Sequence, residues 1–272
     1  LHITQPTLSR QLQRLEQELD VKLFQRSNHS IRLTEDGMLL KRRAQEIVAL
    51  ADKTEKEFQH KEESISGEIV IGSGETKGVH ELAEILSLFR EEYPAVSYDF
   101  YTANADDIKE RLDKGLLDIG LLTEPVDISK YNFVRLDGRE RWGILVRKDS
   151  ALADKKYIRP EDLLQVPLLM VKRPMVQNEL ASWFDHYFDQ IQIVGTYNLI
   201  NNAAVMVERG IGGAVCFHLG IEYDNLRFVP LSPAVETGAV IVWKKNQIAS
   251  QAVYKFIDFL KKYKMSISEN LE

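Results

Sequence analysis

The sequence predicts an α/β protein in which a small helical head with a β-hairpin is joined by a long helix to a larger α/β part. Leucines recur at helical spacing from Leu8 to Leu19, and a second helical pattern runs from Thr34 to about Glu63. After Gly67, short apolar runs typical of strands alternate with helical patterns. Such alternation favours a mostly parallel sheet with helices on both faces.

Size and composition bound the class of protein. The chain has 272 residues, 44% of them hydrophobic and 28% charged, which indicates a globular protein of more than one domain. There is no apolar stretch of about 18 residues and no secretory signal, so we expect a cytoplasmic protein. The lone Cys216 excludes an internal disulfide, and the start at Leu1 rather than Met suggests that a segment is missing upstream.

Charge is unevenly distributed along the chain. Residues 1–45 contain eight Lys or Arg and five Asp or Glu, a net charge of +3, whereas the whole chain has −6 and the remainder therefore −9. A basic head on an acidic body is typical of a DNA-binding module joined to another function. A local fluctuation in composition would explain the charge equally well.

The first helix is predicted from Thr4 to Asp20. Thr4 is a suitable N-cap, Pro6 fits the first turn, and Asp20 ends the pattern. One face is a leucine stripe that we expect to be buried, formed by Leu8, Leu12, Leu15 and Leu19. The opposite face is polar and fits a major groove, because Arg and Gln can bind base edges while Ser and Thr hold phosphates. An ordinary surface helix would carry such residues as often.

A hairpin, or wing, is predicted next. Apolar-alternating runs at 21–27 and 31–34 flank Asn28, His29 and Ser30, and they place Arg26 and Arg32 where they can contact phosphates or a minor groove. The candidate DNA-binding residues are Gln5, Pro6, Thr7, Ser9, Arg10, Gln11, Arg14, Arg26 and Arg32.

The long helix that follows has no obvious core of its own. One side carries Leu40, Ala44, Ile47, Ala51, Thr54 and Phe58. This pattern favours pairing with a second copy, roughly as a coiled coil. A connecting helix without a partner is the alternative.

The run from Leu1 to Leu12, with Leu15-Glu16, Leu23-Phe24, Arg26, Leu33-Thr34 and Gly37, resembles LysR-type transcriptional regulators. The resemblance covers the whole chain and is weaker after residue 65. It implies a winged helix-turn-helix at 1–36, incomplete at its N-terminus, a linker helix at 37–64 and an effector-binding domain at 65–272. His29 departs from the Arg that family members often have, which weakens the case for a phosphate contact there at neutral pH.

The larger part divides into two similar sets of elements, with 64–67 as a hinge before them. Strands are expected at 68–72, 96–101, 118–122, 133–146 (one or two strands), 167–171, 192–196, 213–217, 226–230 and 239–244. Helices are expected at 79–92, 105–114, 160–164, 176–187, 201–209 and 247–263. We expect a hinged clamp that resembles periplasmic solute-binding proteins, with lobe one at about 67–145 and 240–266 and lobe two at about 146–239.

Ligands of open α/β sheets bind beyond the carboxyl ends of strands, so the loops there are the candidate effector site. The Gly-rich loop 72–78 precedes a helix whose free N–H groups can hold an oxyanion, although an ordinary turn is about as common. The candidate effector-binding residues are Ser73, Gly74, Glu75, Thr76, Thr123, Glu124, Trp142, Arg173, Asn198 and Asn201, with Trp142 taken from the family resemblance. For each of these alone, a surface or packing role is the commoner one.

The charges of these loops point in two directions. Arg173 and the helix N-termini favour a carboxylate or phosphate, whereas Glu75 and Glu124 disfavour one unless the ligand also carries a cation or hydroxyls. A zwitterion or polar metabolite is therefore mildly preferred.

An enzyme is the weaker interpretation. The six histidines are scattered without metal-ligand spacing, so we expect no metal and no cofactor. Cys216 lies in an apolar strand and is expected to be a packed core residue, and a Ser-centred nucleophile elbow is absent. The leading hypothesis is a homodimeric or homotetrameric regulator whose partners are operator DNA, a small-molecule effector and RNA polymerase. A solute-binding receptor and a small-molecule enzyme remain the alternatives.

Overall fold

The computed structural model describes residues 4–26, 31–59, 65–246 and 248–269. Contacts divide the chain into two compact units, residues 1–58 and 59–272, which are described separately. The expected turn at 28–30, with His29, and residues 60–64 lie outside the described ranges.

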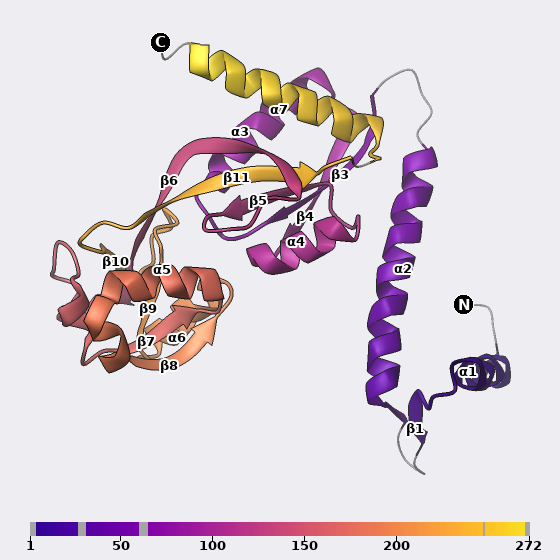
Figure 1. The fold of residues 1–272 in the computed structure, drawn as a ribbon, viewed down its shortest axis with the longest axis horizontal. Coiled ribbons are helices and arrows are strands. Elements are labelled where there is room, and N and C mark those ends of the chain that lie inside the picture. Colours follow the sequence, from indigo (N-terminus) through magenta and orange to yellow (C-terminus); the bar gives the residue numbers. More distant parts are fainter. Residues whose placement is uncertain (1–3, 27–30, 60–64, 247, 270–272) are drawn as a thin grey trace. The chain divides into compact units, whose positions relative to one another are not determined.

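The N-terminal unit contains two helices and a two-stranded antiparallel sheet (Figure 1). Its elements are α1 (Gln5–Leu19), β1 (Phe24–Arg26), β2 (Ile31–Leu33) and α2 (Glu35–Gln59). Asp20 ends α1, as the sequence predicts, and its backbone lies in the left-handed region at φ 51°. Thr4 is the N-cap residue, but its side chain caps no helix N–H and instead hydrogen-bonds the Thr7 hydroxyl at 2.9 Å. The expected side-chain cap is therefore wrong.

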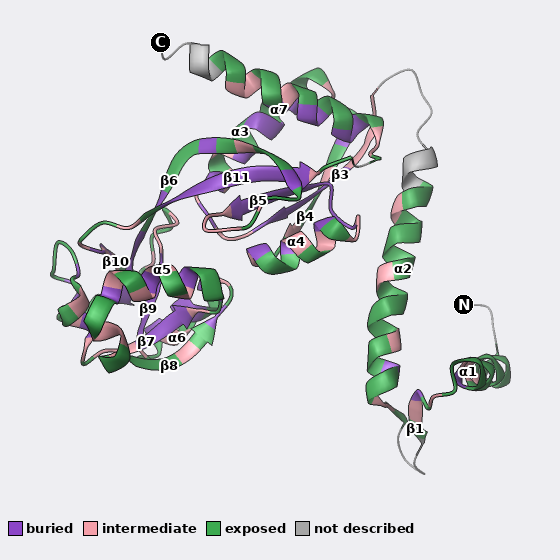
Figure 2. Ribbon diagram, in the orientation of Figure 1, coloured by how far each residue is buried: buried purple, intermediate pink, exposed green. Residues whose placement is uncertain are grey.

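The leucine stripe of α1 is less buried than its spacing predicts. Leu8 and Leu19 are 40% and 46% exposed, and Glu16 is the buried residue of the helix. Figure 2 shows α1 and α2 as largely exposed, in contrast to the strands of the C-terminal unit. The expectation of a buried stripe is wrong because, within the described unit, α1 has only the small sheet and the start of α2 beside it.

The first lobe of the C-terminal unit is a five-stranded sheet in the order β4-β3-β5-β11-β6, in which β3, β4 and β5 are parallel. Its strands are β3 (Gly67–Ser73), β4 (Val96–Thr102), β5 (Ile119–Thr123), β6 (Tyr131–Arg147) and β11 (Glu236–Lys244). Its helices are α3 (Gly78–Glu92), α4 (Ala105–Asp113) and α7 (Gln251–Glu269).

The second lobe repeats this plan with the order β10-β6-β9-β7-β8. Its own strands are β7 (Pro167–Val171), β8 (Gln192–Tyr197), β9 (Gly213–Phe217) and β10 (Leu226–Pro230). Its helices are α5 (Pro174–Phe184) and α6 (Ile200–Glu208), with 3₁₀ turns η1 (Pro160–Leu163) and η2 (Asp185–Gln190).

A single long strand, β6, belongs to both lobes. Its residues up to Arg141 pair with β11, and from Trp142 onward they pair with β9 and β10. The segment that the sequence left as one or two strands is thus one strand. The pairing changes close to the lobe division that we propose from the sequence.

Each sheet buries both faces against helices, which gives four hydrophobic clusters. In β3, Ile69 and Ile71 pack on the α3–α7 side, while Val70 between them packs on the α4 side. In β7, Leu168 and Leu169 likewise pack on opposite faces, toward α5 and α6. This period of two confirms the prediction of sheets with helices on both faces. Within the described residues, no helix has both the length and the hydropathy needed to cross a membrane.

Candidate functional site

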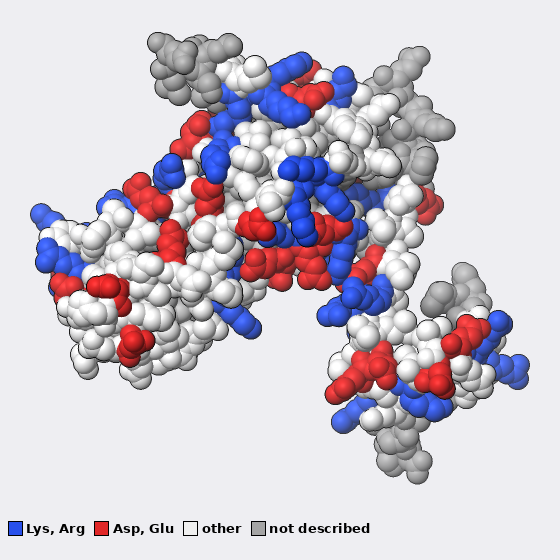
Figure 3. Space-filling view, in the orientation of Figure 1, with Lys and Arg blue, Asp and Glu red and all other residues white. Residues whose placement is uncertain are grey.

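The polar side of α1 is open to solvent. Gln5, Pro6, Thr7, Arg10, Gln11 and Arg14 are exposed, and Ser9 is partly buried. Arg14 donates to Glu18 at 2.7 Å, but this pair lies in water and holds the arginine only weakly. Figure 3 shows that Lys and Arg on this unit are interspersed with Asp and Glu. On the face drawn, the positive charge of the described residues forms no continuous patch.

The hairpin places its basic residues across from polar and apolar partners. Gln25 pairs with Arg32, and Arg26 pairs with Ile31. The Arg32 side chain is exposed, whereas for Arg26 only the backbone is described.

Glu16 joins α1 to the hairpin, a role that the sequence analysis missed. Its carboxylate accepts the Leu23 N–H at 2.7 Å and the Phe24 N–H at 3.2 Å. The available signal was its spacing, because Glu16 lies on the same helical face as Leu12 and Leu19. The buried carboxylate fixes the angle between α1 and the hairpin, and thus the relation between the two candidate DNA-contacting parts.

A cavity of about 70 Å³ lies between the two lobes of the C-terminal unit, at the carboxyl ends of β3, β4, β5, β7, β8 and β9. This is the position that the sequence predicts for a ligand of parallel sheets. The lining residues are Gly74, Glu75, Ala103, Asn104, Ala105, Leu121, Leu122, Thr123, Trp142, Val171, Arg173, Val176, Tyr197, Asn198, Leu199, Ile200, Cys216, Phe217 and Leu219.

Six of the ten candidate effector-binding residues line this cavity: Gly74, Glu75, Thr123, Trp142, Arg173 and Asn198. The remaining four are not among the lining residues. Ser73 donates to the carbonyl oxygen of Gly74, and Glu124 pairs with Arg135 at 2.9 Å. Thr76 and Asn201 bond to Glu140 and Glu75, respectively. Asn104, Tyr197, Cys216 and Phe217 are lining residues that the sequence analysis did not select.

The Gly-rich loop does not offer the free N–H groups that we expected at the start of α3. The Gly78 N–H donates to Glu140 Oε1 at 3.0 Å and to the Thr76 hydroxyl oxygen at 3.1 Å, and Thr76 also donates to Glu140. Glu140 comes from β6 and is almost fully buried. The chain's own carboxylate thus fills this oxyanion position, and a ligand does not find it free.

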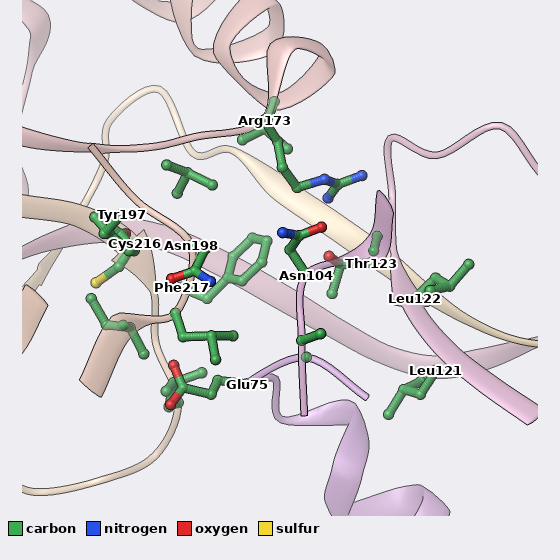
Figure 4. A pocket seen from close by; sticks show the side chains of 18 of the residues that line it. Glu75, Asn104, Leu121, Leu122, Thr123, Arg173, Tyr197, Asn198, Cys216 and Phe217 are labelled. Carbon is green, nitrogen blue, oxygen red and sulfur yellow. The ribbon is translucent and has the colours of Figure 1, made fainter. Parts of the chain in front are cut away.

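Two sets of hydrogen bonds cross the cavity from lobe to lobe. Glu75 of lobe one accepts the Asn201 backbone N–H at 3.2 Å and also its side-chain amide, at the start of α6. Arg173 of lobe two donates to the carbonyl oxygen of Pro125 in lobe one at 3.0 Å. In Figure 4 these two charged residues lie on opposite sides of the cavity, with Phe217 and Asn198 between them.

One wall of the cavity is apolar and closely packed. Trp142 is almost fully buried, donates to Thr237 at 3.2 Å, and packs against Phe217 with ring centroids 4.2 Å apart. Burial raises the pKa of the Cys216 thiol to about 12, so this residue is a neutral packing group. Among the described residues, no group of three or more His, Cys, Asp or Glu is placed to hold a metal ion.

Comparison with known proteins gives matches over both units. Residues 1–38 match the profile described as "Bacterial regulatory helix-turn-helix protein, lysR family", and residues 62–264 match "LysR substrate binding domain". The chain is 33% identical over 226 residues to a probable RuBisCO transcriptional regulator of Gracilaria tenuistipitata var. liui, which covers 79% of this chain and 71% of that protein. It is 29% identical over 217 residues to the transcriptional activator IlvY of Salmonella typhimurium, with coverage of 79% and 74%.

Solved structures show the same fold. CbnR, described as a LysR family transcriptional regulator, is similar with a TM-score of 0.74 at 18% identity, covering 96% of this chain and 90% of that chain. Full-length CbnR in a complex with its target DNA is similar with a TM-score of 0.72 at 19% identity, with coverage of 96% and 91%.

Proposed function

The chain belongs to the LysR family of DNA-binding transcriptional regulators, and on this basis we propose that α1 and the β1–β2 hairpin bind its operator under the control of a small molecule held between the two lobes. The family consists of regulators rather than enzymes. A regulator acts where its operator lies, so we place the protein in the cytoplasm. The observation that supports the effector half of the proposal is the cavity at the carboxyl ends of the strands of both lobes.

The DNA half of the proposal rests on the exposed polar side of α1. In helix-turn-helix proteins, residues near the N-terminus of the recognition helix contact base edges in the major groove. Thr7, Arg10 and Gln11 have their side chains in water at this end of α1. Arg32 on the hairpin is also exposed and is available for a phosphate contact.

Control by a ligand requires two arrangements of the lobes that differ in their affinity for it. The Glu75–Asn201 and Arg173–Pro125 bonds hold the lobes together around the cavity. A ligand that enters from solvent changes this set of bonds, and the change is what we propose is transmitted to the DNA-binding unit.

We also propose that the protein acts as a homodimer or homotetramer that pairs through α2, and that RNA polymerase is a partner in transcription. Of the expected stripe, Leu40 is partly buried, while Ile47 is 68% exposed. The Phe58 side chain is not described. Exposed apolar side chains along one helix favour a second helix as partner.

Operator binding by an Arg10→Ala variant tests the DNA half. Arg10 is exposed and its loss removes contacts to bases or phosphates without disturbing the fold, so we expect a loss of about 1–3 kcal/mol in binding free energy. Affinity is measured on the promoter fragment that the wild-type protein selects from genomic DNA, over a range of salt concentrations. The matched control is Arg209→Ala, an exposed arginine at the end of α6. Unchanged affinity and salt dependence in Arg10→Ala would show that α1 does not face DNA.

A further inference from the structure

Arg173 is a buried cation with an incomplete set of partners. It immediately precedes α5 in lobe two, its side chain lines the interlobe cavity, and the residue is only 6% exposed. Nη2 donates to the Pro125 carbonyl oxygen at 3.0 Å. Nε is buried and has no hydrogen-bond partner among the described residues.

The charge of Arg173 is poorly balanced by the protein itself. Its ion-pair partner is Asp106 of α4, whose Oδ2 lies 3.8 Å from Nε and whose side chain is mostly in water. Burial lowers the pKa of the guanidinium, and Asp106 only partly opposes this. Burial of a cation lowers the free energy of unfolding unless the cation is paired and hydrogen-bonded. Arg173 in this setting is therefore expected to reduce the stability of the fold.

Three other oxyanion positions around the cavity, at the starts of α3, α4 and α6, are already filled by this chain. Glu140 occupies the start of α3, and the Asn104 side chain accepts the Asp106 and Asp107 N–H groups at the start of α4. Glu75 occupies the start of α6 through the Asn201 N–H. Of these anion-binding groups, the Arg173 guanidinium is therefore the one that retains a donor without an acceptor among the described residues.

We propose that Arg173 anchors one carboxylate group of the effector, and that Glu75 limits the effector to a single negative charge. The proposal rests on the proposed function and specifies its ligand as a small monocarboxylate. Glu75 stands on the opposite side of the cavity from Arg173, where it would repel a second anionic group (Figure 4). Ala103, Leu122 and Trp142 also line the cavity and offer an apolar surface to the body of the ligand.

Cavity volume adds a constraint on size. Pockets for drug-sized ligands hold about 300–1,000 Å³. The volume here is about 70 Å³, so a ligand larger than a few heavy atoms enters only if the lobes separate and the Glu75–Asn201 bonds break.

The test observes the Arg173 Nε–H group itself. The full chain is labelled with ¹⁵N-arginine, and the Arg173 Nε–H resonance is identified by its loss in Arg173→Lys. Titration with sodium propionate against sodium chloride at equal ionic strength is expected to move this resonance with saturation, and to move the Nε–H of exposed Arg209 several-fold less. Equal movement of both resonances, or movement of neither, overturns the anchor.

The limit to one charge is tested with malonate, a dianion with the same number of carbon atoms as propionate. Wild-type protein is expected to bind propionate more tightly than malonate. Glu75→Gln removes the opposing charge and is expected to raise the affinity for malonate relative to propionate by about tenfold, equivalent to about 1.4 kcal/mol. Glu91→Gln, an exposed change on α3, leaves the ratio as in the wild type. The ratio also removes any effect of a weaker interlobe contact, because such an effect acts on both probes.

If Glu75→Gln leaves the ratio unchanged, Glu75 does not set the charge of the ligand. A failed propionate titration together with a lower operator affinity in Arg10→Ala would overturn the ligand class and leave the DNA-binding function in place. The two experiments share neither variant nor readout, so their failures are distinguishable.

Discussion

At the scale of single residues, His218 is held neutral by its surroundings. The ring follows β9 and packs against Phe228 with centroids 4.7 Å apart. Burial lowers the pKa of the imidazole below its ordinary 6.5, Lys77 and Arg141 lower it further, and Glu140 partly opposes them. The affinity of His218 for a proton is therefore lower in the folded protein than in the unfolded chain.

This shift predicts a contribution to the pH dependence of stability. As pH falls below about 6.5, the unfolded state binds a proton at His218 before the folded state does, so stability falls until the lower folded-state pKa is reached. In His218→Gln, the loss of melting temperature between neutral and mildly acidic pH should be smaller than in the wild type. Val205→Ala, a change of an exposed residue on α6 that carries no titrating group, should keep the wild-type pH dependence of the melting temperature. Identical slopes in wild type and His218→Gln would contradict the assignment.

The sequence predicts which residues lie near the cavity better than it predicts the hydrogen-bond partners of those residues. Gly74 and Arg173 follow strands and Thr123 ends one, and the rule that ligands bind at the carboxyl ends of parallel strands finds all three from the sequence. The Thr76–Glu140 contact joins residues 64 positions apart, and no local pattern indicates it. For this reason the loop 72–78 looked open to an oxyanion although Glu140 fills it.

At the scale of elements, the periodicity of the sequence predicts the order of the strands and helices. It does not predict the residues at which some of the helices begin and end. The helix expected at 176–187 runs from Pro174 to Phe184, because Asp185 takes φ 51° and the chain continues as a 3₁₀ turn. A proline starts this helix, as its missing N–H allows. The closing helix, expected at 247–263, is described from Gln251 to Glu269.

The start of α2 approaches the segment before β1 so closely that only glycine fits at position 37. A Cβ on Gly37 would lie 2.1 Å from the carbonyl oxygen of Leu23, which accepts the Thr34 N–H at 3.0 Å. Gly37→Ala must therefore shift backbone, with an expected loss of about 1–3 kcal/mol of stability in the N-terminal unit. Hydrogen exchange of the Thr34 amide reports this loss, because the Thr34 N–H donates to the carbonyl oxygen that the new Cβ would displace.

A matched glycine provides the control for this prediction. A Cβ on Gly138 of β6 meets its nearest atom, Glu81 Oε2, at 4.0 Å. Gly138→Ala should leave the exchange of the Thr34 amide at the wild-type rate. An equally slow Thr34 amide in Gly37→Ala would mean that the Leu23 carbonyl does not limit the approach of α2.

At the scale of the whole molecule, α2 carries apolar side chains that a single chain leaves in water. Several large apolar side chains on α2 are exposed, because no contact inside the described N-terminal unit covers them. They belong to Met38, Leu39, Ile47, Val48 and Leu50. A helix with such a surface gains stability from a partner. The effector-binding unit, by contrast, buries each face of its sheets against its own helices.

Ile47→Lys tests whether this surface joins two copies. In a symmetric pair the change removes two buried isoleucines, each worth about 1.5–3 kcal/mol, so the dissociation constant should rise on the order of 100-fold or more. Light scattering after size exclusion at low micromolar concentration should then show monomers where the wild type shows dimers or tetramers. Val205→Lys serves as control, because Val205 is 57% exposed on α6, outside the proposed interface. If Val205→Lys dissociates the assembly and Ile47→Lys does not, the copies pair through the effector-binding unit and α2 only connects the two units of one chain.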